Sequence, residues 1–253
     1  MTRTTEQFHY PGTELTLFEK AWNWKAYWSQ QMVEFVRGDV LEVGAGIGAN
    51  TQLLSTLDHQ TWLCLEPDPE LIRCIELPPG GRHQKVQGVV GDLQKTDLFD
   101  TILYIDVLEH IEDHREELIR AKQHLRPSGN LIVLSPAWPF LFSPFDTAIG
   151  HFRRYTRQSL RAITPSGMIE KRMAYLDSAG LLASAANRWL LRSEMPGEQQ
   201  ILTWDRILVP VSRVMDVGFG WNIGKSILGI WQLRETGRGS VKPCNEPSTN
   251  RRP

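Results

Sequence analysis

Cysteine is scarce in this chain of 253 residues, which contains only Cys64, Cys74 and Cys244. Their scattered positions give neither the close pairing of a metal site nor the density of a disulfide framework. The sequence therefore excludes a small fold that depends on disulfide bonds. Isolated cysteines suit a reducing compartment, and we expect the protein to be cytoplasmic.

An excess of one charge is also absent, because 28 Lys and Arg residues stand against 29 Asp and Glu residues, for a net charge of −1. This balance creates no general attraction to the phosphate backbone of nucleic acid. We therefore expect no nucleic-acid partner.

Long hydrophobic runs are missing as well. The longest uncharged stretch, residues 127–145, contains four prolines, which rule out a continuous membrane-spanning helix. The first six residues lack the apolar segment of a signal peptide. We predict a chain with no transmembrane segment. Apolar residues make up 41% of the sequence, which is enough for one core with insertions.

One stretch, residues 40–51, indicates a ligand site. An apolar run from Val40 to Val43 predicts a buried strand, and Gly44, Gly46 and Gly48 follow it at alternate positions. The residues after them can begin a helix. A strand, a glycine turn and a helix N-terminus together let a ligand approach the backbone and meet unpaired N–H groups.

Three interpretations of this turn are open. An ordinary glycine-rich turn is one of them, and a dinucleotide site is another. The dinucleotide pattern Gly-x-Gly-x-x-Gly does not fit the observed spacing. The third interpretation rests on Glu42, two residues before Gly44. The series Glu-x-Gly-x-Gly-x-Gly resembles motif I of class I S-adenosylmethionine (SAM)-dependent methyltransferases. In that case the Glu42 carboxylate would attract the ammonium of the methionine part of SAM.

Strand and helix patterns alternate along the chain. Apolar runs predict strands at residues 40–43, 61–65, 86–90, 99–105, 130–135, 169–176 and 225–233. Helical patterns separate the first five of these strands, so a parallel doubly wound sheet with right-handed connections is expected. We predict an α/β, Rossmann-like, mostly parallel seven-stranded sheet with helices on both faces. The last strand is expected to be antiparallel, at an inner or edge position.

The expected domain organisation has three parts. Residues 1–37 form an N-terminal helical cap, with a helix over 15–36. Residues 38–235 form the α/β domain, with a helical insertion at about 179–222 in which Pro210 kinks the second helix. Residues 236–253 mix Gly, Pro, Ser, Asn and Arg, and we expect a disordered tail.

Two acids follow the second and third predicted strands. Glu66, followed by Pro67, lies 22 residues beyond Gly44, where a carboxylate of this architecture binds the ribose hydroxyls. Asp68 or Glu70 instead fits a carboxylate in the first turn of the next helix. The resemblance implies that Asp92, followed by Leu93, accepts from the adenine amino group; a plain turn is the alternative. Asp106, after the fourth strand, completes the expected cofactor site.

The resemblance to class I SAM-dependent methyltransferases covers about residues 38–136. After the fourth strand, Leu108-Glu-His110 resembles the subfamily of the ubiquinone and menaquinone enzymes. The stretch Leu125-Arg-Pro-Ser-Gly129 and the later Gly150-His-x-Arg-Arg-Tyr155 are also similar to this group. The resemblance implies SAM as cofactor and a small-molecule acceptor that is methylated on oxygen or nitrogen, and less readily on carbon. It leaves the oligomeric state open.

The acceptor side is expected on the loop after the fifth strand, where ligands of open α/β sheets bind. We predict His151 and Tyr155 as the catalytic residues, with His110 and Asp106 as other candidates for a general base. Substrate contacts are expected from Trp24, Tyr27, Trp138, Arg153 and Arg154. The two arginines would bind an anionic acceptor group, or else pair with acids of the core. The aromatic residues of the cap either dock the helix on the domain or cover the cleft.

No metal site is expected. The cluster Glu109, Glu112, Asp113 and His114 is interpreted as a solvated acidic helix start. Two further functions stay open at this point, namely an NAD-linked oxidoreductase and a SAM-binding protein without catalysis. RNA methylation is disfavoured, since the chain has no basic stripe.

Overall fold

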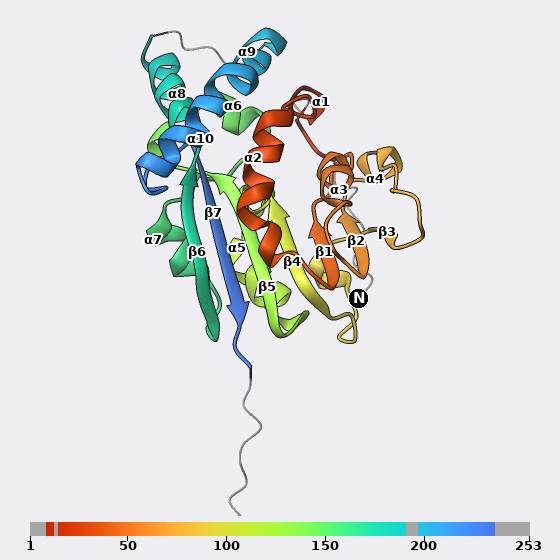
Figure 1. Cartoon of the computed structure of the whole chain (residues 1–253). Helices are drawn as coiled ribbons and strands as arrows, with labels where there is room; N and C mark the ends of the chain where they lie inside the picture. Colours follow the sequence, from red (N-terminus) through yellow and green to blue (C-terminus); the bar gives the residue numbers. More distant parts are fainter. Residues whose placement is uncertain (1–8, 13–14, 191–196, 236–253) are drawn as a thin grey trace, which may run out of the picture.

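The central element of the computed structural model is a seven-stranded mixed sheet with the order β3-β2-β1-β4-β5-β7-β6 (Figure 1). The structure describes residues 9–12, 15–190 and 197–235, and for residues 186–190 the backbone alone. The strands are β1 (Asp39–Val43), β2 (Thr61–Glu66), β3 (His83–Gln87), β4 (Phe99–Ile105), β5 (Leu125–Pro136), β6 (Met168–Leu176) and β7 (Ser226–Leu233). The α/β class, the number of strands and the Rossmann-like winding are as predicted.

Strand β7 is antiparallel to both of its neighbours, β5 and β6, and therefore takes an inner position. The other neighbouring pairs are parallel. Because β7 runs against the rest, it begins at the edge of the sheet where β1, β4 and β5 end. Ser226, its first residue, pairs with Pro136, the last residue of β5. This reversal brings a distant part of the chain to the ligand edge.

Helices cover both faces of the sheet and give it two apolar cores. One core joins α2 (Trp22–Met32), α3 (Ala49–Leu54) and the start of α10 (Val209–Gly218) to the sheet. The other core joins α5 (His114–Gln123) and α7 (Arg157–Ile163) to the opposite face. The β4 residues alternate between the two cores, as the period of a strand requires, with Leu103 in the first and Tyr104 in the second.

The predicted N-terminal helix is interrupted. It consists of α1 (Leu15–Phe18), α2 and the 3-10 turn η1 (Val33–Phe35). The interruption has a cause far along the chain. The Asp205 carboxylate accepts hydrogen bonds from the backbone N–H groups of Asn23 and Trp24, at 3.2 and 2.9 Å, and so satisfies the first turn of α2. A buried acid from the insertion therefore fixes where α2 begins.

The insertion between β6 and β7 consists of α8 (Ser178–Leu190), α9 (Glu198–Thr203), the π-helical turn η5 (Trp204–Leu208) and α10. The chain is helical from Glu198 to Gly218, and the π turn ends two residues before Pro210, where a kink was predicted. Pro210 has no N–H to donate, so the preceding turn cannot keep its regular hydrogen bonds. These helices lie above the ligand edge of the sheet, together with α1 and α6 (Pro144–Ala148) (Figure 1).

Two strands differ from the prediction by several residues. The third begins at His83 and not at residue 86. The third strand ends at Gln87 because Gly88, with φ +155°, turns the chain, and Val90 is then buried in the 3-10 turn η2 (Val90–Asp92). The fifth strand begins at Leu125, which pairs with Phe99, and therefore includes the predicted turn before residue 130. Short turns complete the fold: α4 (Leu71–Cys74), η3 (Leu108–His110) and η4 (Pro139–Leu141).

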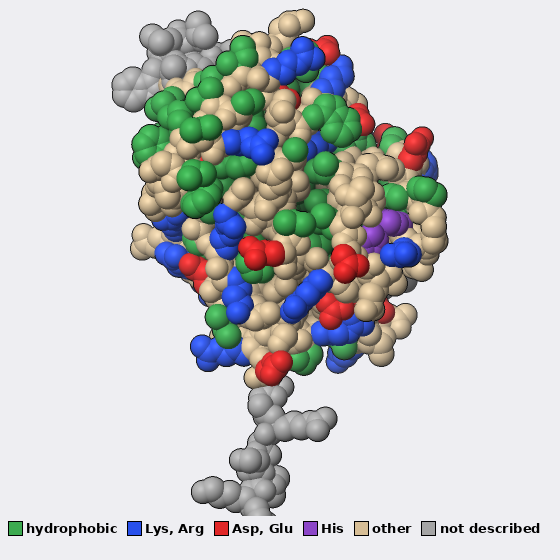
Figure 2. Space-filling view, in the orientation of Figure 1, with side chains coloured by type: hydrophobic (Ala, Val, Ile, Leu, Met, Phe, Trp, Pro, Cys, Tyr) green, Lys and Arg blue, Asp and Glu red, His purple; other side chains and the backbone are tan. Residues whose placement is uncertain are grey.

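The surface of one face is shown in Figure 2. Apolar side chains gather at its upper left, over α8 and α10, whereas charged side chains of both signs are mixed over its lower part. The exposed apolar residues of α8, η5 and α10 include Leu182, Ile207, Val211, Val214 and Val217. Every helix in the described part of the chain is too short or too polar to cross a bilayer. The predicted tail, residues 236–253, lies outside the described residues, and the division into domains stays a prediction.

Candidate active site

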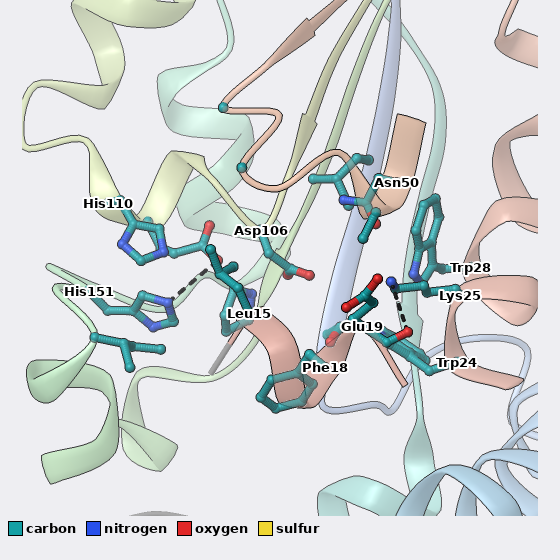
Figure 3. A pocket seen from close by; sticks show the side chains of 18 of the residues that line it. Leu15, Phe18, Glu19, Trp24, Lys25, Trp28, Asn50, Asp106, His110 and His151 are labelled. Carbon is teal, nitrogen blue, oxygen red and sulfur yellow. Dashed lines mark hydrogen bonds and ion pairs between the residues drawn. The ribbon is translucent and has the colours of Figure 1, made fainter. Parts of the chain in front are cut away.

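A cavity of about 220 Å³ opens at the edge where β1, β4 and β5 end (Figure 3). Four parts of the chain enclose it: the N-terminal segment with α2, the glycine turn after β1, the loops after β4 and β5, and the insertion with the start of β7. Its lining consists of Tyr10, Leu15, Phe18, Glu19, Trp24, Lys25, Trp28, Gly44, Ala45, Gly46, Ile47, Ala49, Asn50, Ile105, Asp106, Glu109, His110, Pro136, Phe145, Ile149, His151, Arg154, Trp204, Lys225 and Ser226.

The glycine turn requires its three glycines. Gly44, Gly46 and Gly48 have φ values of +66°, +57° and +82°, a region that residues with a Cβ rarely adopt. A Cβ on Gly44 would lie 2.7 Å from Val107, and one on Gly48 would lie 2.9 Å from Ile75. Gly46 differs, since a Cβ there would meet only Leu15, at 3.8 Å. Gly46 thus lies at the open side of the turn, where a ligand can approach the backbone.

Glu42 lies behind this turn and not in the cavity wall. Its Oε2 atom accepts hydrogen bonds from the Thr51 hydroxyl at 2.6 Å and from the Trp62 indole N–H at 2.8 Å. Burial raises the pKa of this carboxyl to about 7. The structure therefore directs Glu42 toward α3 and β2, where it supports the glycine turn from below.

Glu66 connects the second strand to the glycine turn. Its carboxylate accepts hydrogen bonds from the Gly46 N–H at 2.8 Å and from the Asp68 N–H at 2.9 Å. Each oxygen keeps a further lone pair, which suits a donor such as a ribose hydroxyl. Asp68 accepts from the N–H groups of Glu70 and Leu71, so it serves the first turn of the next helix, as its position suggested.

The remaining predicted cofactor residues differ in position. Pro67 and Leu93 are half-buried beside the ends of β2 and β3. Asp92 is exposed, and its carboxylate accepts a hydrogen bond from the Val89 N–H at 2.9 Å. The N-terminal segment crosses this side of the molecule, because the Tyr10 N–H donates to Asp68 at 2.7 Å.

Asp106 directly follows β4 and lies in the left-handed region, with φ +53°, and its side chain faces the cavity. The side chain is exposed to the space of the cavity, but protein surrounds that space. The surrounding protein acts as burial and raises the pKa of this carboxyl to about 6. Positive charge on His151, in its protonated form, and on Lys225 acts in the opposite direction. Asp106 is therefore an anion at neutral pH in the centre of the site.

His151 is held by an acid that the sequence analysis did not single out. Its Nδ1 lies 2.9 Å from Oδ1 of Asp146, a fully buried residue. Burial alone would raise the pKa of Asp146, but hydrogen bonds from His151, Arg154 and Ser143 hold it far below its ordinary value. Since a carboxylate can only accept, Nδ1 carries a hydrogen, and in the neutral imidazole the free lone pair is therefore on Nε2.

The Nε2 atom of His151 lies 3.8 Å from Oε1 of Glu109, beyond hydrogen-bonding distance. Glu109 is fully buried, accepts a hydrogen bond from Ser135 at 3.0 Å, and has a pKa well above its ordinary value because of burial and the nearby Asp106 charge. The interpretation of Glu109 as part of a solvated helix start is therefore wrong, because the turn η3 directs this side chain inward.

Glu109, His110 and His151 form the one group that the described residues offer to a metal ion. One ligand atom from each lies within 4.8 Å of the others. The rings of His110 and His151 meet edge to face, with centroids 4.5 Å apart, and burial lowers the pKa of His110 to about 3. Imidazole nitrogens and a carboxylate oxygen are suitable ligands for a divalent cation. The other members of the predicted acidic cluster do not join this group.

Four of the predicted acceptor-site residues do not line the cavity. The Tyr27 hydroxyl donates to Asp216 at 2.7 Å, and the Trp138 indole N–H donates to the Gly224 carbonyl at 2.7 Å. The Tyr155 side chain is buried, and its hydroxyl donates to the Leu108 carbonyl at 3.1 Å. Arg153 donates to the carbonyls of Ile111 and Glu112. In each case the polar atoms that chemistry would need already serve the fold.

The structure does bring Trp24, Gly44, Gly46, Asp106, His151 and Arg154 to the cavity, as predicted from the sequence. Sequence reasoning missed Asp146, Lys25 and Lys225. Asp146, five residues before His151, gave a weak signal as an acid near a histidine. For the two lysines the sequence held no signal, because only the tertiary structure brings α2 and the start of β7 to the same cavity.

The sheet order with an inner antiparallel β7, and the glycine turn after β1, are those of class I SAM-dependent methyltransferases. The profile of a family described as a methyltransferase domain matches residues 25–181, and the chain belongs to this family. It is thus a SAM-dependent methyltransferase, and the NAD-linked alternative is excluded. The residues present fit the cofactor, because the open side of Gly46 and the Asp106 carboxylate border one cavity.

Two curated relatives are similar to this chain. A ubiquinone biosynthesis O-methyltransferase of Bradyrhizobium diazoefficiens is 24% identical over 62% of this chain and 66% of its own length. A trans-aconitate 2-methyltransferase of Deinococcus radiodurans is 26% identical over 70% of this chain and 72% of its own length. The chain thus spans about two thirds of the length of the first of them.

A solved structure supports the fold. The N-methyltransferase NodS from Bradyrhizobium japonicum WM9, in complex with S-adenosylhomocysteine, superposes with a TM-score of 0.55 at 13% identity. The superposition covers 86% of this chain and 88% of NodS.

Proposed function

We propose that this enzyme transfers the methyl group of SAM to an oxygen or nitrogen atom of a small-molecule acceptor in the cavity, and that His151 takes the proton of the acceptor. The observation that carries the proposal is the pairing of His151 with the buried Asp146 carboxylate at 2.9 Å. This pairing fixes the tautomer of the imidazole and leaves Nε2 as a base within a cavity lined by Asp106 and the glycine turn.

The cofactor is proposed to lie along the glycine turn. Gly44, Gly46 and Asp106 border the cavity and suit the methionine end, where the Asp106 carboxylate would attract the ammonium. Glu66 would accept hydrogen bonds from the ribose hydroxyls with its remaining lone pairs. Asp92, with Pro67 and Leu93 beside it, is proposed for the adenine end. Glu42 and Gly48 would support this arrangement from behind the turn.

Bound SAM supplies a methyl group that is activated by the positive sulfur, and its transfer leaves S-adenosylhomocysteine. The walls of the cavity hold the acceptor in line with the breaking bond, and such positioning can supply much of the acceleration. As the new bond forms, the acceptor's O–H or N–H proton passes to Nε2 of His151. The imidazolium that results is stabilised by the Asp146 carboxylate, to which its Nδ1–H already donates.

The state of Glu109 decides whether this base is available. An ionised Glu109 at 3.8 Å would favour a proton on Nε2 and so block the base. Burial and the nearby Asp106 charge raise the pKa of Glu109 well above its ordinary value and so disfavour the ionised form. A neutral Glu109 leaves the lone pair of Nε2 free to accept the proton of the acceptor.

A small acceptor is supported by the enclosed, mainly apolar wall. Phe18, Trp24, Trp28, Phe145 and Trp204 surround a few polar groups, a composition typical of small-molecule pockets. The two curated relatives are named for ubiquinone biosynthesis and for trans-aconitate, which are small molecules. The name of the first also supports oxygen as the methylated atom.

The test is a screen for methyl transfer from labelled SAM to phenols, amines, carboxylates and hydroxylated lipid precursors, with and without a chelator. Acceptor-dependent formation of S-adenosylhomocysteine is the expected result. The His151→Ala variant should bind SAM normally and lose this activity. A protein that binds SAM but methylates no O–H or N–H compound would contradict the proposal.

A further inference from the structure

The predicted anion-binding pair, Arg153 and Arg154, is not available to an acceptor. Both guanidinium groups are engaged within the protein. Arg153 donates to two backbone carbonyls at 2.8 and 2.9 Å. Arg154 lines the cavity, but it makes two parallel hydrogen bonds to the Asp146 carboxylate at 2.9 and 3.0 Å. Its charge is already neutralised by a buried acid.

Lys225 differs from these two arginines in its surroundings. It directly precedes β7, and its backbone is fixed on both sides. Its N–H donates to the Asp177 carbonyl at 3.0 Å, and its carbonyl accepts from the Ala137 N–H at 2.8 Å. The side chain lines the cavity, with Nζ 5.1 Å from the centre of the Trp204 ring. Among the residues that the structure describes, no carboxylate lies within 4.0 Å of this ammonium and no hydrogen bond of Nζ is found.

An ammonium in such a place lacks a direct counter-ion. Burial, together with the Arg154 charge, disfavours its charged form and lowers the pKa of Lys225, while the more distant Asp177, Asp146 and Asp106 charges act in the opposite direction. A charge held away from bulk water is stabilised by a close partner of opposite sign. An anionic group entering the cavity would supply that partner.

The strand order indicates whether an anionic group bound by Lys225 would belong to the cofactor or to the acceptor. The glycine turn follows β1, Asp106 follows β4, and Lys225 precedes β7, while β5 lies between β4 and β7. Lys225 therefore lies on the side of Asp106 that is away from the glycine turn. The cofactor belongs to the glycine turn, so Lys225 belongs to the acceptor side of the cavity.

Building on the proposed function, we propose that the acceptor is an amphipathic carboxylic acid whose carboxylate binds Lys225. Its apolar body packs between the aromatic walls, of which Trp204 lies directly beneath the ammonium. Its O–H or N–H group is presented to Nε2 of His151. Lys225 is thus the residue that selects acidic acceptors over neutral ones of the same shape.

The test uses matched ligands, namely hydroxylated or aminated aromatic acids and the primary amide of each. Calorimetry on the full-length enzyme loaded with S-adenosylhomocysteine measures binding without any need for turnover. We expect the wild-type enzyme to bind at least one acid about 10- to 100-fold more tightly than its amide, the scale of a charge-assisted hydrogen bond. In Lys225→Met this preference should fall to about one, and Lys225→Arg should retain part of it.

A matched control is Lys171→Met, which removes an exposed lysine near the start of β6, at the opposite edge of the sheet. It should keep the full preference for the acid. The proposal is overturned if no acid binds more tightly than its amide, or if Lys225→Met keeps the preference. A SAM affinity that falls about tenfold or more in both Lys225 variants would also overturn it, because Lys225 would then serve the cofactor.

Failure of the proposed function would give a different result from failure of the Lys225 proposal. In that case acids bind in a manner that depends on Lys225, but labelled methyl groups are not transferred to them. Thermal unfolding of each variant shows whether it is folded, and Lys225→Arg keeps the test valid if Lys225→Met is unstable.

Discussion

Asp146 holds His151 within one short segment, with its Oδ1 atom 2.9 Å from Nδ1 of the imidazole. The same carboxylate accepts two hydrogen bonds from Arg154 and two from the amide and hydroxyl of Ser143. The segment from α6 to Arg154 is therefore organised around one buried charge. A base that is oriented before the acceptor arrives loses little entropy during the reaction.

If His151 is the general base, His151→Ala should lower kcat by about 10²–10⁴-fold, the usual contribution of such a group. The dissociation constant for SAM should be unchanged, because the proposed cofactor contacts lie elsewhere. Asp146→Asn is the companion variant, and it should lower kcat as well, since it removes the charge that stabilises the imidazolium. Steady-state kinetics and calorimetry give both values, and an unaltered kcat in His151→Ala would remove this residue from the chemistry.

SAM binding should depend on pH through Asp106. The pKa of this carboxyl is raised to about 6 by burial, so it is anionic above pH 6 and neutral below it. As the pH falls below 6, the attraction to the ammonium is lost, and affinity should fall by about tenfold for each pH unit. Calorimetry from pH 5 to 7.5 measures this, with Asp106→Asn as a control that should show a flat profile. A wild-type affinity that is constant over this range would argue against the contact.

Stability should depend on pH through Glu42, which has a pKa of about 7 in the folded protein and an ordinary value of 4.5 in the unfolded chain. The folded state holds the proton more tightly, so the stabilisation is complete below pH 4.5 and is lost as the pH rises toward 7. Glu42→Gln lacks this titration. Relative to wild type, it should gain about 2 kcal/mol in the free energy of unfolding between pH 5 and pH 8. Urea unfolding of the SAM-free proteins measures the difference, and parallel pH profiles would contradict it.

The glycine turn offers a matched pair of variants. A Cβ on Gly46 has room, whereas a Cβ on Gly48 would lie 2.9 Å from Ile75. Gly46→Ala should therefore fold at a cost of about 1–2 kcal/mol for its positive φ and lose SAM affinity by about tenfold or more. Gly48→Ala should lose more stability. Thermal unfolding and calorimetry separate the two effects, and normal SAM binding by Gly46→Ala would rule out close approach at this residue.

Tyr27 should contribute to the stability of the fold and not to binding of the acceptor. Its hydroxyl donates to Asp216, which also accepts from the backbone N–H groups of Asp177 and Ser178. Tyr27→Phe removes one donor from a buried carboxylate and should cost about 1–3 kcal/mol in the free energy of unfolding. The KM values for SAM and acceptor should stay unchanged. A raised acceptor KM without loss of stability would instead indicate that Tyr27 contacts the acceptor.

The sequence by itself determined the class of fold, the glycine turn and the family, because these depend on local patterns. Apolar runs bounded by glycine and acids predict strands whose parallel ends share one edge. From this alone Asp106, Gly46 and His151 could be placed near a single cavity. The start of the fifth strand at Leu125 could not be predicted, since its pairing with β4 decides it.

Only the tertiary structure decided which side chains face the ligand. The direction of α2 follows from Asp205, which binds its first turn from about 180 residues away and leaves Tyr27 in the core while Trp24 and Lys25 line the cavity. Lys225 reaches the ligand edge because β7 runs antiparallel between β5 and β6. Neither fact has a local signal in the sequence, because both arise from contacts between segments that are distant along the chain.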